Sequence, residues 1–216
     1  MSFTVHPNSP NKQAIPLVEE AFRGQEARLR ELLPELSDEL QVYVYAEDLI
    51  QETGTGGYAY SPTVLSLAID NDFKDKEKQL SALVGTIYHE SYHLTQGHTG
   101  NETKAPATSA LDSAIYEGCA TVFERTYAGV EPLWGDYSMH SEEELRQWCE
   151  ALSRITPDEW LGDEGEVWQR WSFYDAEDGQ RWKAYKVGTW VVERCLRETG
   201  KDIRDLRLMA ASDIRT

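Results

Sequence analysis

The stretch GTIYHESYHLTQGH (85–98) contains a His-Glu-x-x-His motif formed by His89, Glu90 and His93. On a helix, residues four apart lie one turn apart on the same face. His89 and His93 can therefore present ring nitrogens to one metal ion, and Glu90 lies beside them, within reach of a water molecule on that ion. This spacing is typical of a zinc site with two histidine ligands and a glutamate base.

The residues around the motif predict a long helix. Apolar residues recur at helical spacing from about residue 76, and Gly97 is a suitable stop signal. His89 and His93 lie opposite the apolar stripe of Leu83, Ile87 and Leu94, because two residues turn a helix by about 200°. We therefore expect one face to pack into the core and the histidine face to line a cleft, where small residues at 82, 85 and 86 leave room.

A catalytic zinc ion normally takes three protein ligands, so a third ligand must lie elsewhere in the chain. The extended motif HExxHxxGxxH, which is typical of metzincins, would need glycine at position 96 and histidine at 99, but Gln96 and Thr99 occupy these positions. We therefore reject that interpretation and keep His98 as a weak alternative. A better candidate is Glu117, which lies 24 residues after His93 on a helix predicted over about 109–128.

The surroundings of Glu117 add two expectations. Gly118 stands in a helix interior, where glycine costs about 1 kcal/mol relative to alanine, so a close approach to the first helix or to the metal is expected. Thr121 and Glu124 share a face with Glu117, and either one could orient a ligand histidine. Glu124 also remains an alternative third ligand.

The rest of the chain predicts a small sheet followed by helices. Residues 1–15 indicate an irregular lead-in, and apolar spacing predicts a helix over about 16–33. Alternating segments at 41–47 and 63–70, with the glycine-rich segment TGTGGYAY (53–60) between them, predict two or three antiparallel strands joined by a turn or bulge. Ser141, Pro157 and Gly200 mark the boundaries of further helices in a tryptophan-rich region over about 130–216.

Composition limits the classes of function. The 216 residues suit a single domain, and 38 acidic against 21 basic side chains give a net charge of −17. That charge disfavours binding to nucleic acids and to anionic membranes. The chain has three cysteines, and we find neither a CxxC pair nor a recognisable signal peptide or membrane-spanning segment. We therefore expect a cytoplasmic protein, and the oligomeric state stays open.

Two segments together resemble the gluzincins, the zinc peptidases whose third ligand is a glutamate. These are the HExxH motif and the downstream Glu117-Gly118-Cys119-Ala120. With the glycine-rich strand pair at 53–70 and the Tyr-x-x-Gly pattern in AYKVGTWVVERCL (184–196), the chain is more closely similar to a bacterial family of predicted zinc-dependent proteases of unknown function. The resemblance covers roughly residues 40–210.

This resemblance implies an α+β, zincin-like fold in which a small antiparallel sheet packs on the HExxH helix beside a helical C-terminal lobe. It implies one Zn²⁺ per chain, held by His89, His93 and Glu117. Glu90 would activate the metal-bound water that attacks a peptide bond of a peptide or protein substrate.

Two further roles follow from the resemblance. Tyr185 would donate a hydrogen bond to the oxyanion of the transition state. Gly56, Gly57 and Tyr58 would form an edge strand that pairs with extended substrate. Two alternatives to a peptidase remain, a zinc-binding scaffold or regulatory protein without catalysis, and a zinc amidase that acts on a non-peptide amide.

Overall fold

The computed structural model describes residues 2–100, 107–162 and 165–215, and the chain divides into two compact units. The first unit comprises residues 1–104 and 124–130, and the second comprises 105–123 and 131–216. The helix α4 (Ala110–Ala128) contributes its last turns to the first unit and its earlier turns to the second. In the described part of the chain, no helix is long and apolar enough to cross a membrane.

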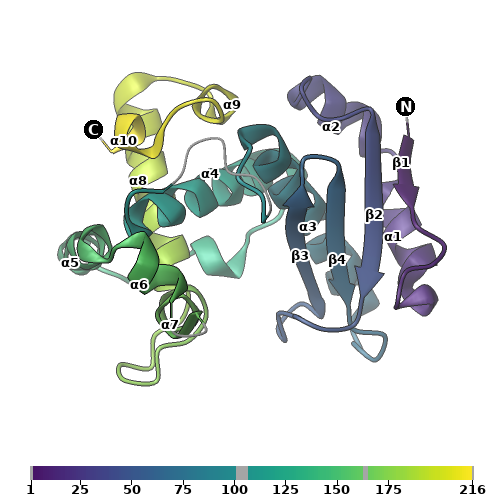
Figure 1. Cartoon of the computed structure of the whole chain (residues 1–216), viewed down its shortest axis with the longest axis horizontal. Helices are drawn as coiled ribbons and strands as arrows, with labels where there is room; N and C mark the ends of the chain where they lie inside the picture. The colour runs from purple at the N-terminus through teal and green to yellow at the C-terminus, as the bar shows by residue number, and fades with distance from the viewer. Residues whose placement is uncertain (1, 101–106, 163–164, 216) are drawn as a thin grey trace. The chain divides into compact units, whose positions relative to one another are not determined.

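The first unit holds one mixed sheet with helices packed against it (Figure 1). In the described residues, its strands lie in the order β1-β2-β4-β3. The strands are β1 (Ser2–Val5), β2 (Glu39–Tyr45), β3 (Thr55–Ser61) and β4 (Val64–Ile69). The helices that belong wholly to this unit are η1 (Lys12–Ala14), α1 (Ile15–Phe22), α2 (Glu26–Leu32) and α3 (Lys76–Gln96).

The sheet is mixed, so the expectation of an antiparallel sheet was wrong. β1 pairs with β2 and β2 with β4 in parallel, while only β3 and β4 are antiparallel. Alternation of apolar residues fixes which face of β2 is buried, and Leu40, Val42 and Val44 are fully buried as that pattern requires. Alternation carries no information on the neighbouring strand, and here β4 turns back to lie between β2 and β3.

Two other expectations for the N-terminal region were also wrong. Residues 1–15 contain β1 and η1 rather than an irregular lead-in. The helix expected over 16–33 is two helices, because Arg23 is extended and Gly24 adopts a left-handed φ of 83°. The glycine-rich segment is mostly strand β3 itself, with a register shift between Ala59 and Ser61 where a bulge was expected.

The helix α3 has the predicted extent. Asp75 caps its N-terminus by accepting a hydrogen bond from Lys78 N at 3.0 Å, and Gly97 ends it with a left-handed φ of 76°. Figure 1 shows α3 behind β3 and β4. Near its start, the buried amide of Gln79 donates to the carbonyls of Gly54 and Asp70 at 2.9 and 2.7 Å, which fastens the helix to the β3–β4 pair.

Residues 85–96 of α3 are all buried, so this part of the helix is buried on its histidine face as well as on its apolar face, whereas Lys76, Glu77, Lys78 and Ser81 in its first part are exposed.

The second unit is helical in its described residues. Besides the earlier turns of α4, it contains η2 (Leu133–Gly135), α5 (Glu142–Arg154), α6 (Pro157–Leu161), α7 (Glu166–Ser172), α8 (Lys183–Thr199), α9 (Ile203–Leu206) and α10 (Ala211–Ile214). The sequence predicted the capping box of Ser141 and Glu144 and the left-handed cap at Gly200, and both are present.

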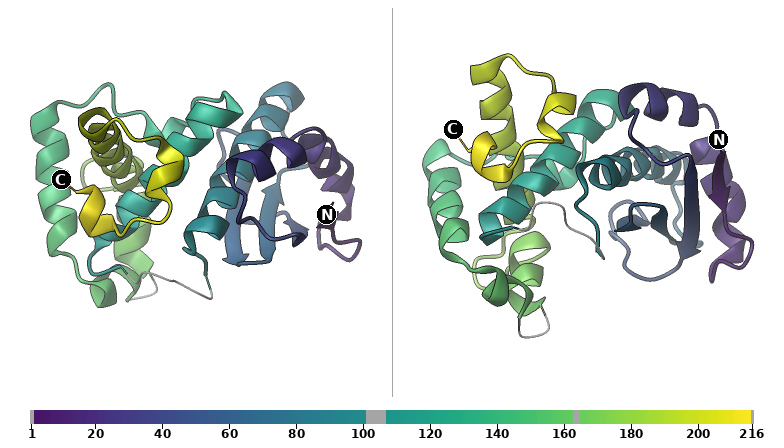
Figure 2. Two further views of the ribbon diagram at one scale, coloured as in Figure 1. Left: turned by 90° about the horizontal axis from the view of Figure 1, so that it is seen from above. Right: turned by 45° about the horizontal axis from the view of Figure 1, so that its top comes forward.

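The helices α4 and α8 cross one another (Figures 1 and 2). Two glycines, Gly118 on α4 and Gly188 on α8, lie at their contact. A Cβ on Gly118 would overlap the backbone of Gly188 and lie 2.6 Å from Thr189 N. A Cβ on Gly188 would overlap the carbonyl of Ala114, with its carbon at 2.6 Å. Gly118 therefore serves contact with α8, and the expectation that it allows approach to the first helix or the metal was wrong.

We expect Gly188→Ala to lower the free energy of unfolding by about 1–3 kcal/mol, because the new methyl group meets backbone that cannot rotate away. Urea unfolding followed by circular dichroism measures the change. Helix propensity alone would give the opposite sign, a gain of about 1 kcal/mol. Arg197→Ala, at an exposed position of the same helix, is the control, and a stabilised Gly188→Ala protein would refute the tight crossing.

Candidate metal centre

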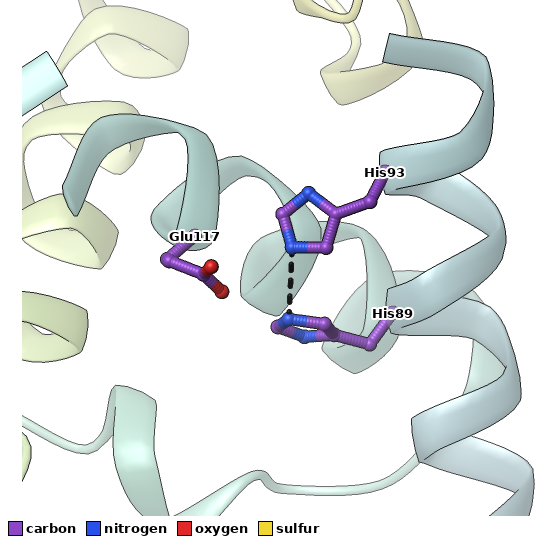
Figure 3. Close-up of side chains that lie close together, drawn as sticks. All are labelled: His89, His93 and Glu117. Atoms are coloured by element: carbon purple, nitrogen blue, oxygen red, sulfur yellow. Dashed lines mark hydrogen bonds between the residues drawn. The ribbon is translucent and has the colours of Figure 1, made fainter. Parts of the chain in front are cut away.

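The side chains of His89, His93 and Glu117 converge (Figure 3). One ligand atom from each residue lies within 4.8 Å of those of the other two. Both histidines project from α3, one turn apart, and the carboxylate of Glu117 on α4 points toward their rings. The histidines are each 4% exposed, while Glu117 is only partly buried.

The geometry of the two histidines fits a tetrahedral metal ion. Their Nε2 atoms lie 3.2 Å apart. Two nitrogens bound to zinc at about 2.0–2.1 Å and at a tetrahedral angle are separated by roughly 3.3 Å. Two imidazole nitrogens and one carboxylate are also the donor set of a catalytic zinc site that leaves one position open. The residues present therefore fit a zinc ion.

Each histidine has a polar partner at its other ring nitrogen. His89 Nδ1 lies 3.2 Å from Glu124 Oε2, and His93 Nδ1 lies 3.3 Å from Gln96 Oε1. Each contact favours a proton on Nδ1, which leaves Nε2 unprotonated and able to bind a metal. Glu124 and Gln96 thus set the orientations of the two imidazole rings.

Glu124 is 1% exposed and lies seven residues after Glu117 on α4. Burial raises the pKa of its carboxyl group, while the hydrogen bond with His89 acts in the opposite direction. Gly85 makes space for this carboxylate, because a Cβ on Gly85 would overlap Glu124 Oε1. Of the two expected orienting residues, Glu124 contacts His89, whereas Thr121 packs its methyl group toward Gly135.

Glu90 lies on α3 beside the histidines and is 7% exposed. Its Oε2 accepts a hydrogen bond of 2.8 Å from the backbone N–H of Ala59 on β3. This bond fixes the carboxylate between the helix and the edge of the sheet. Sequence reasoning missed Ala59 because its contribution comes from the backbone, and it missed Gln96, whose spacing of three residues from His93 was the available signal.

The structure places the remaining candidates as follows. Gly56, Gly57 and Tyr58 lie on β3, which is an edge strand of the sheet in the described residues. Tyr185 is partly buried in the first turn of α8. The ring of His98 lies 5.3 Å from that of His93, centroid to centroid. The roles of these residues in binding or catalysis stay predictions.

Comparison with known proteins places the chain in a family. No curated protein matches the chain, and no solved structure matches it. A family model described as "Predicted Zn-dependent protease (DUF2268)" matches residues 17–216, well over half of the chain. This match confirms the resemblance that was drawn from the HExxH, EGxA and Tyr-x-x-Gly segments. The chain therefore belongs to the DUF2268 family of predicted Zn-dependent proteases.

Proposed function

We propose that this protein is a zinc-dependent peptidase with a zincin-like fold, which hydrolyses a peptide bond of a peptide or protein substrate. The observation that carries the proposal is the convergence of His89, His93 and Glu117, with Glu90 held beside them. Membership of a family of predicted Zn-dependent proteases supports the same conclusion. We also propose that it acts in the cytoplasm.

The three converging residues would hold one zinc ion per chain. Bound there, zinc would lower the pKa of a water molecule and polarise the scissile carbonyl. The chain's own part is to keep both Nε2 atoms unprotonated, which Glu124 and Gln96 favour through the opposite ring nitrogens. Burial of both histidines limits competition from bulk water.

Glu90 would be the general base. Its carboxylate would take a proton from the attacking water and then deliver it to the leaving amine. The bond from Ala59 N–H restricts rotation of the carboxylate, so the base is oriented before substrate arrives. A purely structural metal site has no use for such a base, which favours catalysis over a scaffold role. Tyr185 would donate to the developing oxyanion.

Metal analysis tests the ligand set. We expect about one zinc per chain in untagged wild-type protein, and its loss from both His93→Ala and Glu117→Ala, because each removes one of three ligands. Mass spectrometry of the native protein measures the stoichiometry. Loss of zinc from His93→Ala but not from Glu117→Ala would move the third ligand to His98 or Glu124. Absence of zinc from the wild-type protein even after reconstitution would refute the proposed enzymatic function.

Glu90→Gln tests the base. The amide oxygen can still accept from Ala59 N–H, so the fold and the zinc content should be unchanged, while kcat falls by about 10²–10⁴-fold. Cleavage of a peptide library, followed by mass spectrometry, compares this variant with the wild type. Equal cleavage by the two proteins would show that Glu90 is not the base.

Glu124→Gln tests the orientation of His89. We expect zinc affinity to fall about 10–100-fold, because the anionic partner of the ligand histidine is lost. Competition with a chromophoric chelator measures the dissociation constant. Thr121→Val is the matched control on the same helix, since the Thr121 hydroxyl is buried without a hydrogen-bond partner in the described structure. Equal effects of the two substitutions would remove Glu124 from this role.

A further inference from the structure

The edge of β3 has a defined set of outward-facing backbone groups. Gly54 O accepts from Asp70 N at 2.9 Å, and the antiparallel register continues with Gly56 opposite Ala68 and Tyr58 opposite Ser66. In an antiparallel pair, every second residue bonds to the partner strand and the residues between them point away. The outward-facing residues of β3 are therefore Thr55, Gly57 and Ala59.

Two of these three positions are already occupied. The carbonyl of Thr55 accepts a hydrogen bond of 2.9 Å from Ile50 N. At Ala59 both backbone groups are bonded, since its N–H donates to Glu90 Oε2 at 2.8 Å and its carbonyl accepts from Gly100 N at 3.0 Å. The chain's own residues thus close the edge on both sides of Gly57.

Gly57 is exposed, and within the residues that the structure describes its outward N–H and carbonyl have no backbone partner. It also lies against α3, because a Cβ at this position would overlap Thr86 Cγ2 and lie 2.7 Å from Glu90 Cγ. A substrate residue that pairs with Gly57 would therefore lie directly beside the side chain of the proposed base.

An extended peptide that adds to a sheet edge gains hydrogen bonds at every second residue, so its affinity normally grows with length. Here a substrate could pair with one residue of β3, and its backbone would have to turn away from the edge in both directions. We infer that the substrates of this protein are short peptides or peptide chain ends, rather than the interior of long extended segments. This inference rests on the proposed function.

Binding of metal-directed probes tests the inference without any need for turnover. The probes are peptide hydroxamates with one to four residues, together with reverse hydroxamates that extend from the metal-binding group in the other chain direction. Titration calorimetry on the zinc-loaded full chain gives each affinity, and His93→Ala protein is the control for metal-dependent binding.

We expect affinity to rise about three- to tenfold when the residue that pairs with Gly57 is added, and then to change less than twofold as the probes lengthen. In the four-residue probes, N-methylation should weaken binding by a similar factor at one position only. A steady gain with each residue, or several positions sensitive to N-methylation, would overturn the short-substrate inference and leave the zinc peptidase intact. Failure of every hydroxamate to bind the zinc-loaded protein would overturn both.

Discussion

The candidate site depends on one constraint, which is that two imidazole rings one helical turn apart must hold their Nε2 atoms 3.2 Å from each other inside the protein. Two such rings with unprotonated nitrogens do not attract one another, and burial of their polar edges costs free energy unless other groups bond to them. Glu124 and Gln96 provide those bonds at Nδ1. The arrangement makes chemical sense when a cation lies between the Nε2 atoms, which is why the geometry and the family description agree.

Bringing the partners close enough requires that side chains be absent at particular points around α3. The strand β3 lies so near the helix that position 57 has no room for a Cβ, and the carboxylate of Glu124 occupies the space left by Gly85. Glycine in a strand or a helix interior normally weakens the element by roughly 0.5–1 kcal/mol. In this protein the two glycines lie beside Glu90, the proposed base, and beside Glu124, the partner of a proposed ligand histidine, where close packing fixes the position of polar groups.

Local structure was predictable from the sequence, and long-range pairing was not. The HExxH spacing places His89 and His93 on one face of a helix because four residues make about one helical turn, and the caps at Gly97 and Gly200 are equally local. Glu117 needed a family resemblance, since many glutamates fit a helix face. The parallel pairing of β2 with β4 and the break at Gly24 were missed, because alternation and helical spacing do not reveal strand order or a single left-handed residue. No side-chain pattern could have revealed that the backbone N–H of Ala59 bonds to Glu90.

The division of α4 between the two units has a consequence for the order in which the protein can be completed as it leaves the ribosome. Residues 124–130 belong to the first unit, yet they follow residues 105–123 of the second. When β1 to α3 have left the ribosome, the nascent chain contains both histidines but does not yet expose Glu117 or Glu124. The first unit can therefore be finished only after part of the second has been synthesised. A truncation at any single point cannot separate the two units, because residues 105–123 of the second unit lie between the two segments of the first.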